Sequence, residues 1–159
     1  MSATDPDSLM REAIAQARAG IATGQSPFGC AIAVGGELIA ACHNVVWATT
    51  DITAHAEVAA LRQACAKTGQ LHLSGAVVAT TCEPCPMCMA ALHWAQVDTV
   101  YYGAVIADAT GAGFNELIIS APDMVRLGRS PVKLVKGPFS AECAALFQEW
   151  RRSGDAREY

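Results

Sequence analysis

Short apolar runs alternate along this chain with segments whose apolar residues recur at helical spacing. The clearest apolar runs are residues 30–34, 38–42, 76–81 and 99–106. The first two flank Gly35 and Gly36, a pair typical of a tight hairpin turn, whereas the later ones are separated by helical segments. Strands that alternate with helices predict an α/β fold, and we expect a three-layer α/β/α sandwich around a mixed sheet of about five strands.

Four segments carry the helical pattern, namely residues 9–21, 53–67, 87–96 and 140–150. Asp5 followed by Pro6 is typical of a helix start, Gly69 is placed as a C-terminal stop, and Ser140 is placed to cap the last helix. These signals predict where the helices begin and end.

The stretch before the last expected strand is patterned least clearly. Residues 111–115 suit a loop, residues 117–119 form too short an apolar run to assign, and residues 126–130 have no clear pattern. A last strand is expected at residues 132–135, and whether a helix precedes it is left open. The chain contains no internal repeat and no linker, so residues 1–159 are expected to form a single domain.

A single core is sufficient for a chain of 159 residues and 16.6 kDa, because a domain of that size buries roughly 70% of its unfolded surface. Hydrophobic residues make up 52% and charged residues 16% of the sequence, and the mean hydropathy is +0.26. This composition excludes disorder and leaves little polar surface, so we expect self-association, most simply as a homodimer.

The charge balance bears on the kind of partner. Eleven basic and fifteen acidic residues give a net charge of −4 and a pI near 5.5, which disfavours nucleic acid as a partner. No uncharged apolar run approaches the roughly 18 residues that span a bilayer, and residues 1–7 are acidic, unlike a signal peptide. We therefore expect a soluble, cytoplasmic protein without a membrane partner.

The seven cysteines are an odd number, and no export signal is expected, so disulfides are not expected. Isolated cysteines such as Cys30, Cys65 and Cys143 lie in apolar stretches and are interpreted as small buried residues. Cys82, Cys85 and Cys88 fall within seven residues. Cys85 and Cys88, together with His55, could bind zinc through two thiolates and one nitrogen, and all three lie at predicted helix starts, where the dipole favours thiolate. Three ligands leave one position for water, and Glu57 would supply the proton carrier that a catalytic water needs.

Two alternatives stay open at this point. Cys82 could join Cys85 and Cys88 in an iron–sulfur or structural zinc cluster, although the fourth cysteine and proline of the common cluster motif are missing after Cys88. Glu57 could be a solvated glutamate on a surface helix. The other three histidines are interpreted as packed or surface residues and not as ligands.

Two short motifs in this chain match the pair H-x-E and P-C-x-x-C: residues 55–57, His-Ala-Glu, and residues 84–88, Pro-Cys-Pro-Met-Cys. With their flanking residues they resemble the cytidine deaminase superfamily, in particular its branch of small guanine deaminases, tRNA adenosine deaminases and fungal-type cytosine deaminases. The resemblance to bacterial guanine deaminases covers nearly the whole chain. It includes Pro27-Phe28-Gly29, Asn44, Asp51, Trp94-Ala95, Ala112-Gly113-Phe114, Phe147, Trp150, Glu158 and Tyr159.

This resemblance implies a zinc-dependent deaminase that converts guanine to xanthine and ammonia, with one zinc ion per subunit held by His55, Cys85 and Cys88. Zinc lowers the pKa of a bound water from about 15.7 towards 7, so that hydroxide is available at neutral pH. Glu57 would take the proton, pass it to ring nitrogen N3 as hydroxide adds at C2, and then help to protonate the departing ammonia.

The substrate-binding residues that the resemblance implies are Phe28, Asn44, Ala56, Phe114, Glu116 and Tyr159. Asn44 resembles an amide at the ring edge, although an asparagine at the end of a strand also suits a turn. Glu116 stands where the family has an aspartate, one methylene longer, and it could instead be solvated. The C-terminal segment, about residues 138–159, resembles one that covers the active site, sometimes that of the partner subunit, so exchange between subunits is expected.

Other functions fit parts of the same pattern. The substrate could be cytosine, an amino-triazine such as ammeline, or the wobble adenosine of a tRNA. The acidic charge opposes tRNA, and the aromatic C-terminal residues oppose cytosine. A non-catalytic deaminase-like protein with structural zinc is the alternative from another class, and the presence of Glu57 opposes it.

Overall fold

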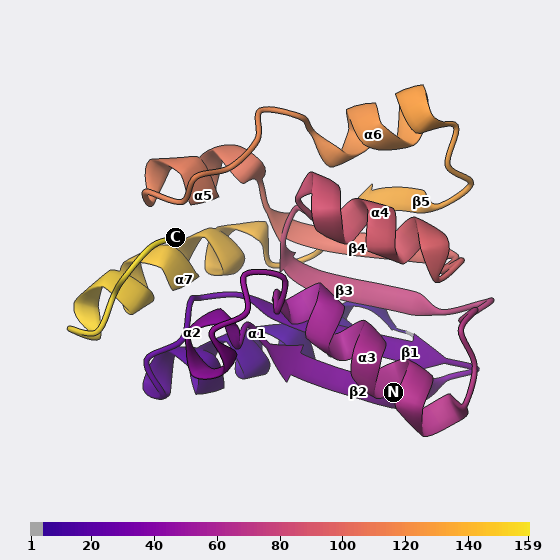
Figure 1. Ribbon diagram of the computed structural model, residues 1–159, viewed down its shortest axis with the longest axis horizontal. Helices are drawn as coiled ribbons and strands as arrows, with labels where there is room; N and C mark the ends of the chain where they lie inside the picture. Colours follow the sequence, from indigo (N-terminus) through magenta and orange to yellow (C-terminus); the bar gives the residue numbers. More distant parts are fainter. Residues whose placement is uncertain (1–4) are drawn as a thin grey trace.

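The computed structural model of the chain describes residues 5–159, which form five strands and seven helices in three layers (Figure 1). The first four residues of the acidic N-terminus lie outside this range. The strands are β1 (Gly29–Val34), β2 (Glu37–His43), β3 (Val77–Cys82), β4 (Thr99–Ala104) and β5 (Lys133–Lys136). The helices are α1 (Pro6–Ala22), α2 (Val46–Thr49), α3 (Ala56–Thr68), α4 (Pro86–Trp94), α5 (Ile106–Gly111), α6 (Ala121–Gly128) and α7 (Ser140–Arg152). Within the described range no helix is both long and apolar enough to cross a membrane.

The five strands form one mixed sheet in the order β2-β1-β3-β4-β5, which confirms the expected α/β fold. β1 pairs antiparallel with β2 and β3, whereas β3 with β4 and β4 with β5 are parallel. The hairpin between β1 and β2 turns at Gly35 and Gly36, whose φ angles of 57° and 87° suit glycine at both positions of a two-residue turn. The parallel strands are joined through helices, so their carboxyl ends meet at one edge of the sheet.

Helices cover both faces of the sheet (Figure 1). On one face α3, α4 and α6 enclose a core that includes Ile32 and Val78. On the other face α1 and α7 enclose a core that includes Ala31 and Ala79. Neighbouring residues of β1 and of β3 thus enter different cores, and this is why both strands read as unbroken apolar runs in the sequence.

Some element boundaries differ from those expected. α3 begins at Ala56 and not at residue 53, because the backbone of His55 is extended, with ψ at 159°, and this residue is the N-cap. β4 ends at Ala104, so that Ile106 opens α5 instead of ending the strand. The short helices α2 and α5 have no counterpart among the expected elements, and α6 is the helix that the sequence leaves open before the last strand.

Of the two expected N-caps, that of the first helix is confirmed and that of the last helix is wrong. Asp5 caps α1 as expected, since its carboxylate accepts a hydrogen bond from the backbone N–H of Ser8 at 3.1 Å. The expectation that Ser140 caps α7 is wrong. The N-cap is Phe139, at a φ of 58°, and the hydroxyl of Ser140 instead donates to the carbonyl of Gly137 at 3.2 Å.

Candidate active site

Three side chains that the sequence singles out as metal ligands lie together where α3 and α4 begin. His55 is the N-cap of α3, Cys85 is the N-cap of α4, and Cys88 lies in the first turn of α4. Their ligand atoms lie within 4.8 Å of one another, and among residues 5–159 no other histidine, cysteine, aspartate or glutamate joins the group. Cys82 stands apart from it, with its sulfur 3.6 Å from the carbonyl oxygen of Val105.

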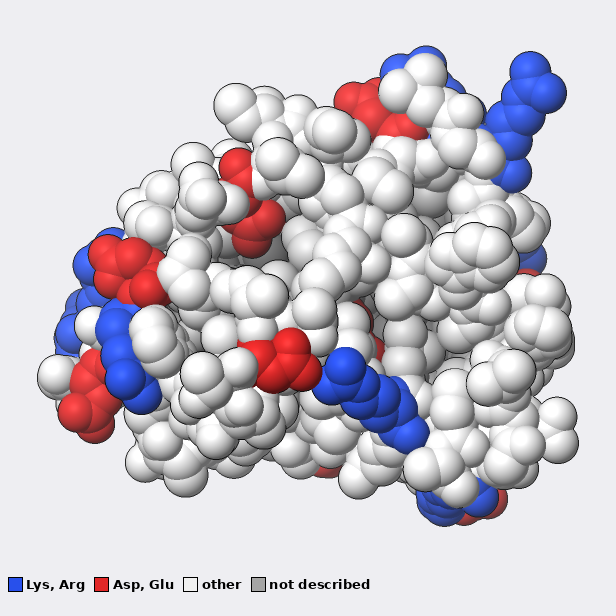
Figure 2. All heavy atoms as spheres, in the orientation of Figure 1, with Lys and Arg blue, Asp and Glu red and all other residues white. Residues whose placement is uncertain are grey.

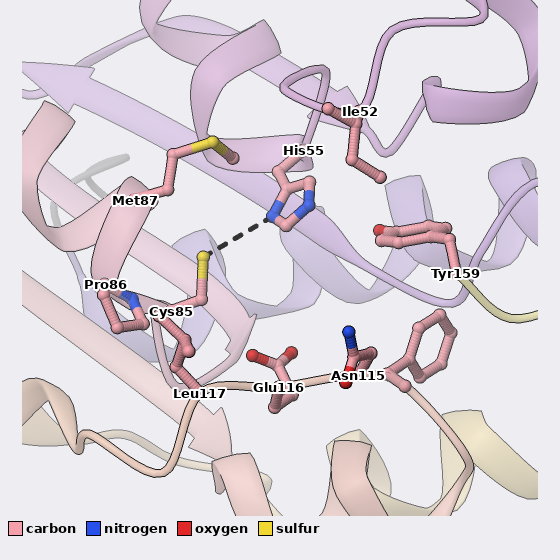
Figure 3. A pocket seen from close by; sticks show the side chains of 10 residues that line it. Ile52, His55, Cys85, Pro86, Met87, Asn115, Glu116, Leu117 and Tyr159 are labelled. Carbon is pink, nitrogen blue, oxygen red and sulfur yellow. Dashed lines mark hydrogen bonds between the residues drawn. The ribbon is translucent and has the colours of Figure 1, made fainter.

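The distances within this group fit a tetrahedral zinc ion. Nδ1 of His55 lies 3.6 Å from Sγ of Cys85 (Figure 3). It lies 3.5 Å from Sγ of Cys88. Zinc–sulfur bonds of about 2.3 Å and a zinc–nitrogen bond of about 2.0 Å, at a tetrahedral angle, place two such ligand atoms about 3.5 Å apart. One imidazole and two thiolates are also a donor set that zinc prefers, so the residues fit this metal.

The two cysteines of the group differ in their affinity for protons. The pKa of Cys85 is lowered to about 4, because its sulfur accepts a hydrogen bond from Cys88 and lies beside His55. The pKa of Cys88 is raised in turn by its hydrogen bond to Cys85 and by burial. One of the two thiols is therefore ionised at neutral pH, and a divalent cation binding here would displace the proton of the other.

Glu57 lies in the first turn of α3 with 6% of its surface exposed, so the alternative of a solvated surface glutamate is wrong. Its Oε1 accepts a hydrogen bond from the hydroxyl of Thr80, on β3, at 2.9 Å. The same hydroxyl lies 3.1 Å from the carbonyl oxygen of Cys82 and donates to one of the two at a time. Burial and the charge of Cys85 raise the pKa of Glu57. A fixed carboxylate of this kind is suited to taking up and returning a proton.

Two hollows meet beside the metal group. An outer pocket of about 260 Å³ and an inner pocket of about 20 Å³ share four lining residues, His55, Cys85, Glu116 and Tyr159. Figure 3 shows these four side chains arranged around a common centre in the outer pocket. The inner pocket is also lined by Glu57 and is large enough for about one water molecule.

Glu116 belongs to the segment between α5 and α6 and is half-buried. Its side chain faces the pocket in Figure 3, so it is not simply solvated. Burial, followed by the charge of Cys85, raises the pKa of Glu116 to about 7. A carboxyl group that titrates near neutrality and faces the metal group can exchange a proton or accept a hydrogen bond from a bound molecule.

The C-terminal residue lies in the site of its own chain. The hydroxyl of Tyr159 accepts a hydrogen bond from Nδ2 of the fully buried Asn44 at 2.6 Å, and its ring centroid lies 5.6 Å from that of His55. Oδ1 of Asn44 accepts from the backbone N–H of Val46 at 3.1 Å. Asn44 therefore forms the turn that leads into α2 and, lining neither pocket, is connected to the site through the hydroxyl of Tyr159.

Contacts that the sequence does not reveal hold the last residues over the site. Nε1 of Trp47, in α2, donates to the carbonyl of Arg157 at 3.2 Å, and the guanidinium of Arg157 lies 4.1 Å from the centroid of the Trp47 ring. The backbone N–H of Asn115 donates to the carbonyl of Tyr159 at 3.1 Å. The C-terminal residues thus bridge α2 and the segment that carries Glu116.

Two phenylalanines form an aromatic wall, whereas Ala56 does not reach the pockets. The ring centroids of Phe28 and Phe114 lie 5.0 Å apart in an edge-to-face arrangement, and Phe114 stacks on Trp150 of α7 at 5.1 Å. Phe28 lines the inner pocket and Phe114 the outer one. The side chain of Ala56 is fully buried in the core and lines neither pocket, which leaves only its backbone for contact with a ligand.

The first part of the chain matches a family model. The model that describes the cytidine and deoxycytidylate deaminase zinc-binding region matches residues 3–104. This range ends with β4 and contains His55, Glu57, Cys85 and Cys88. The metal group and its adjacent glutamate therefore lie wholly within the matched region.

Individual relatives match almost the whole chain. Guanine deaminase from Bacillus subtilis is 35% identical over 158 residues, which cover 96% of this chain and 98% of that protein. The tRNA-specific adenosine deaminase of Bacillus subtilis is 32% identical over 157 residues, which cover 96% of this chain and 95% of that protein. The solved structure of guanine deaminase from Nitrosomonas europaea superposes with a TM-score of 0.84 at 30% identity, covering 92% of this chain and 85% of that one.

Proposed function

The chain belongs to the cytidine and deoxycytidylate deaminase family, and from this premise we propose that it deaminates guanine to xanthine and ammonia with one zinc ion per subunit. The observation that carries the proposal is the buried Glu57 beside a group of three zinc-type ligands. A structural zinc site uses four protein ligands and needs no carboxylate next to them. This arrangement therefore supports hydrolysis over a purely structural role.

Glu57 moves the protons of the proposed reaction. When bound, zinc lowers the pKa of a water molecule from about 15.7 towards 7. As the water oxygen forms a bond to C2 of guanine, Glu57 takes the released proton and gives it to N3. Glu57 then takes the proton of the added hydroxyl group and gives it to the amino group, so that the C2–N bond breaks, C2 becomes a carbonyl and ammonia leaves. Thr80, at 2.9 Å from Oε1 of Glu57, keeps the carboxylate oriented during these transfers.

In this proposal the base lies against the aromatic wall, between Asn44 and Glu116. The amide of Asn44 can donate and accept at the ring edge, and the carboxylate of Glu116 can accept from the N–H groups of guanine. The backbone of Ala56, at the start of α3, is the remaining proposed contact. Nδ2 of Asn44 donates to the hydroxyl of Tyr159, and the contact between this nitrogen and the base is proposed to replace that hydrogen bond.

The charge distribution supports a free base over a tRNA. The net charge is −4, and on the face shown in Figure 2 the Lys and Arg side chains are scattered and form no continuous basic patch. Proteins that grip a phosphate backbone usually present such a patch. The 32% identity to a tRNA-specific adenosine deaminase nevertheless makes the wobble adenosine the second candidate substrate.

Ammonia release by the purified, zinc-loaded protein tests the proposed substrate. The assay compares guanine, cytosine, adenine, guanosine, ammeline and a tRNA with adenosine at the wobble position. We expect turnover of guanine, with xanthine identified by chromatography. Turnover of another base, or inosine in the tRNA, without xanthine from guanine would reject guanine and keep the zinc mechanism. If no substrate released ammonia, a non-catalytic zinc protein would be favoured.

We further propose that two chains form a homodimer. Large apolar side chains are exposed on α4, on α6 and on the segment between α5 and α6: Trp94 at 78%, Leu127 at 69% and Ile118 at 100%. Such surfaces commonly mark protein interfaces. The C-terminal segment, about residues 138–159, packs on its own chain here, and in this dimer it is proposed to take the same place on the partner subunit. Light scattering of the purified protein tests the dimer. We expect the mass of two chains, and the mass of one chain would contradict the proposal.

Thr80→Val removes the hydroxyl that binds Glu57 and keeps the shape of the side chain. A hydrogen bond to a charged group contributes about 1.5–3 kcal/mol, and without it the carboxylate adopts orientations unsuited to proton transfer. We expect kcat on guanine to fall by about tenfold while zinc content stays unchanged. Thr81→Val is the matched control, because the hydroxyl of Thr81 accepts from the backbone N–H of Gly29 at 3.1 Å and does not contact Glu57. Equal losses of kcat in both variants would contradict the role of Thr80.

A further inference from the structure

Glu83 directly precedes residues 84–88, the motif that carries two of the zinc-type ligands, and is not a ligand itself. It is 8% exposed and lines the inner pocket. Its carboxylate accepts two hydrogen bonds from distant backbone N–H groups: Oε2 from Ile106 at 3.1 Å and Oε1 from Ala121 at 2.8 Å. Neither the metal group nor the proton transfers described above use this side chain.

The two partners of Glu83 are the first residues of α5 and of α6. Between these helices lie residues 112–120, the segment that carries Phe114 and Glu116. The backbone N–H of Glu83 also donates to the carbonyl of Ala104, at the end of β4, at 2.8 Å. One buried residue therefore ties the start of α5, the helix before this segment, and the start of α6, directly after it, to the turn that leads into the zinc-type cysteines.

The chemistry of these contacts makes them specific for a carboxylate. A negative charge is favoured at the N-terminus of a helix, and here two helices point their first N–H groups at one charge. Ala121 is fully buried, so its N–H has no access to water if Glu83 withdraws. In a glutamine, an NH2 group replaces one of the two carboxylate oxygens, so one backbone N–H would face another donor instead of an acceptor.

We propose that Glu83 is a positioning residue of the base-binding site, which sets the place of Glu116 opposite the metal group by holding the starts of α5 and α6. This inference rests on the proposed function, because Glu116 is the group through which Glu83 acts on the base. Glu83 itself neither touches the base nor carries a proton.

Glu83→Gln tests the effect on catalysis. A displacement of about 1 Å in a reacting group can cost a hundredfold in rate, so we expect kcat/KM for guanine to fall by about 10- to 100-fold, with zinc content unchanged. Glu37→Gln is the matched control for the loss of a negative charge, since the Glu37 side chain is 74% exposed and pairs with Lys67 at the surface. We expect this control to keep the wild-type kcat/KM.

A double-mutant cycle distinguishes positioning of Glu116 from a general loss of stability. In the Glu116→Gln background, Glu83→Gln should lower kcat/KM by less than about twofold, because the group that Glu83 positions is already missing. An equal loss in both backgrounds would overturn the proposal. Loss of zinc from Glu83→Gln would overturn it too, because the residue would then support the metal group.

Hydrogen exchange of the amides in residues 112–120 gives a readout that does not require deamination. We expect faster exchange in Glu83→Gln and in Ile106→Pro. The second variant removes the backbone N–H that donates to Oε2 of Glu83 and leaves the carboxylate in place. Proline suits the first position of a helix, and the extended Val105 before it, with ψ at 162°, is compatible with proline. Unchanged exchange in both variants would overturn the proposal whatever the substrate. Faster exchange in a protein that leaves guanine intact would reject only the proposed function.

Discussion

Glu57→Gln is expected to keep zinc bound and to lower guanine turnover by at least about a hundredfold, the usual scale for the loss of a general acid–base group. Glutamine has the shape of glutamate, and its amide oxygen can still accept the hydrogen bond from Thr80. The buried side chain therefore keeps its packing but can no longer carry a proton between the water and N3. Steady-state kinetics with chromatographic detection of xanthine, together with zinc content from plasma emission, checks both halves of this expectation.

The exposed Glu37 again provides the control for Glu57→Gln, because Glu37→Gln removes the same charge far from the metal group. This control should turn over guanine at the wild-type rate. Unchanged turnover in Glu57→Gln would contradict the assignment of the proton carrier. If the variant instead lost its zinc, Glu57 would be a support of the metal group.

The features that could be predicted from the sequence are those set by residues close to them in the chain. Gly35 and Gly36 alone specify the hairpin turn, and Asp5 caps α1 through a residue three positions away. The metal ligands are also signalled locally, because His55 and Cys85 both stand at the starts of helices. Local chemistry of this kind was sufficient for the fold class and for the metal group.

Contacts between distant residues leave no such local signal. Glu83 reaches Ile106 and Ala121, which are 23 and 38 residues away in the sequence. Asn44 and Tyr159 are 115 residues apart and meet through a single hydrogen bond. Only the packing of α2, α5 and α6 around the end of the sheet brings these groups together, so the support of the site emerged from the structure and not from the motifs.

The same limit explains the wrong cap of α7. Serine is a frequent N-cap and aromatic residues avoid positive φ, so local preference favours Ser140. In the folded chain Phe139 adopts a φ of 58°, and the guanidinium of Arg11 lies 4.4 Å from the centroid of its ring. Tertiary contacts of this kind override local propensity.

Substitution of a metal ligand is expected to have the second large effect, the loss of zinc and of activity. Cys85→Ser and His55→Ala should each reduce the zinc content from one per chain to nearly none and abolish deamination, because two remaining ligands bind zinc far more weakly than three. The unfolding temperature should fall as well, since a metal that binds only the folded chain stabilises it. Plasma emission and differential scanning calorimetry measure the two quantities.

Cys82→Ser is the matched control, because it makes the same change three residues before Cys85, at a sulfur that faces the carbonyl of Val105 and lies outside the metal group. This variant should keep one zinc per chain and most of the guanine turnover. Addition of a chelator should lower the unfolding temperature of the wild type and of Cys82→Ser but leave that of Cys85→Ser unchanged, because a ligand stabilises only the chain that binds it. If Cys82→Ser also lost its zinc, the assignment of the three ligands would be wrong and Cys82 would belong to the metal site.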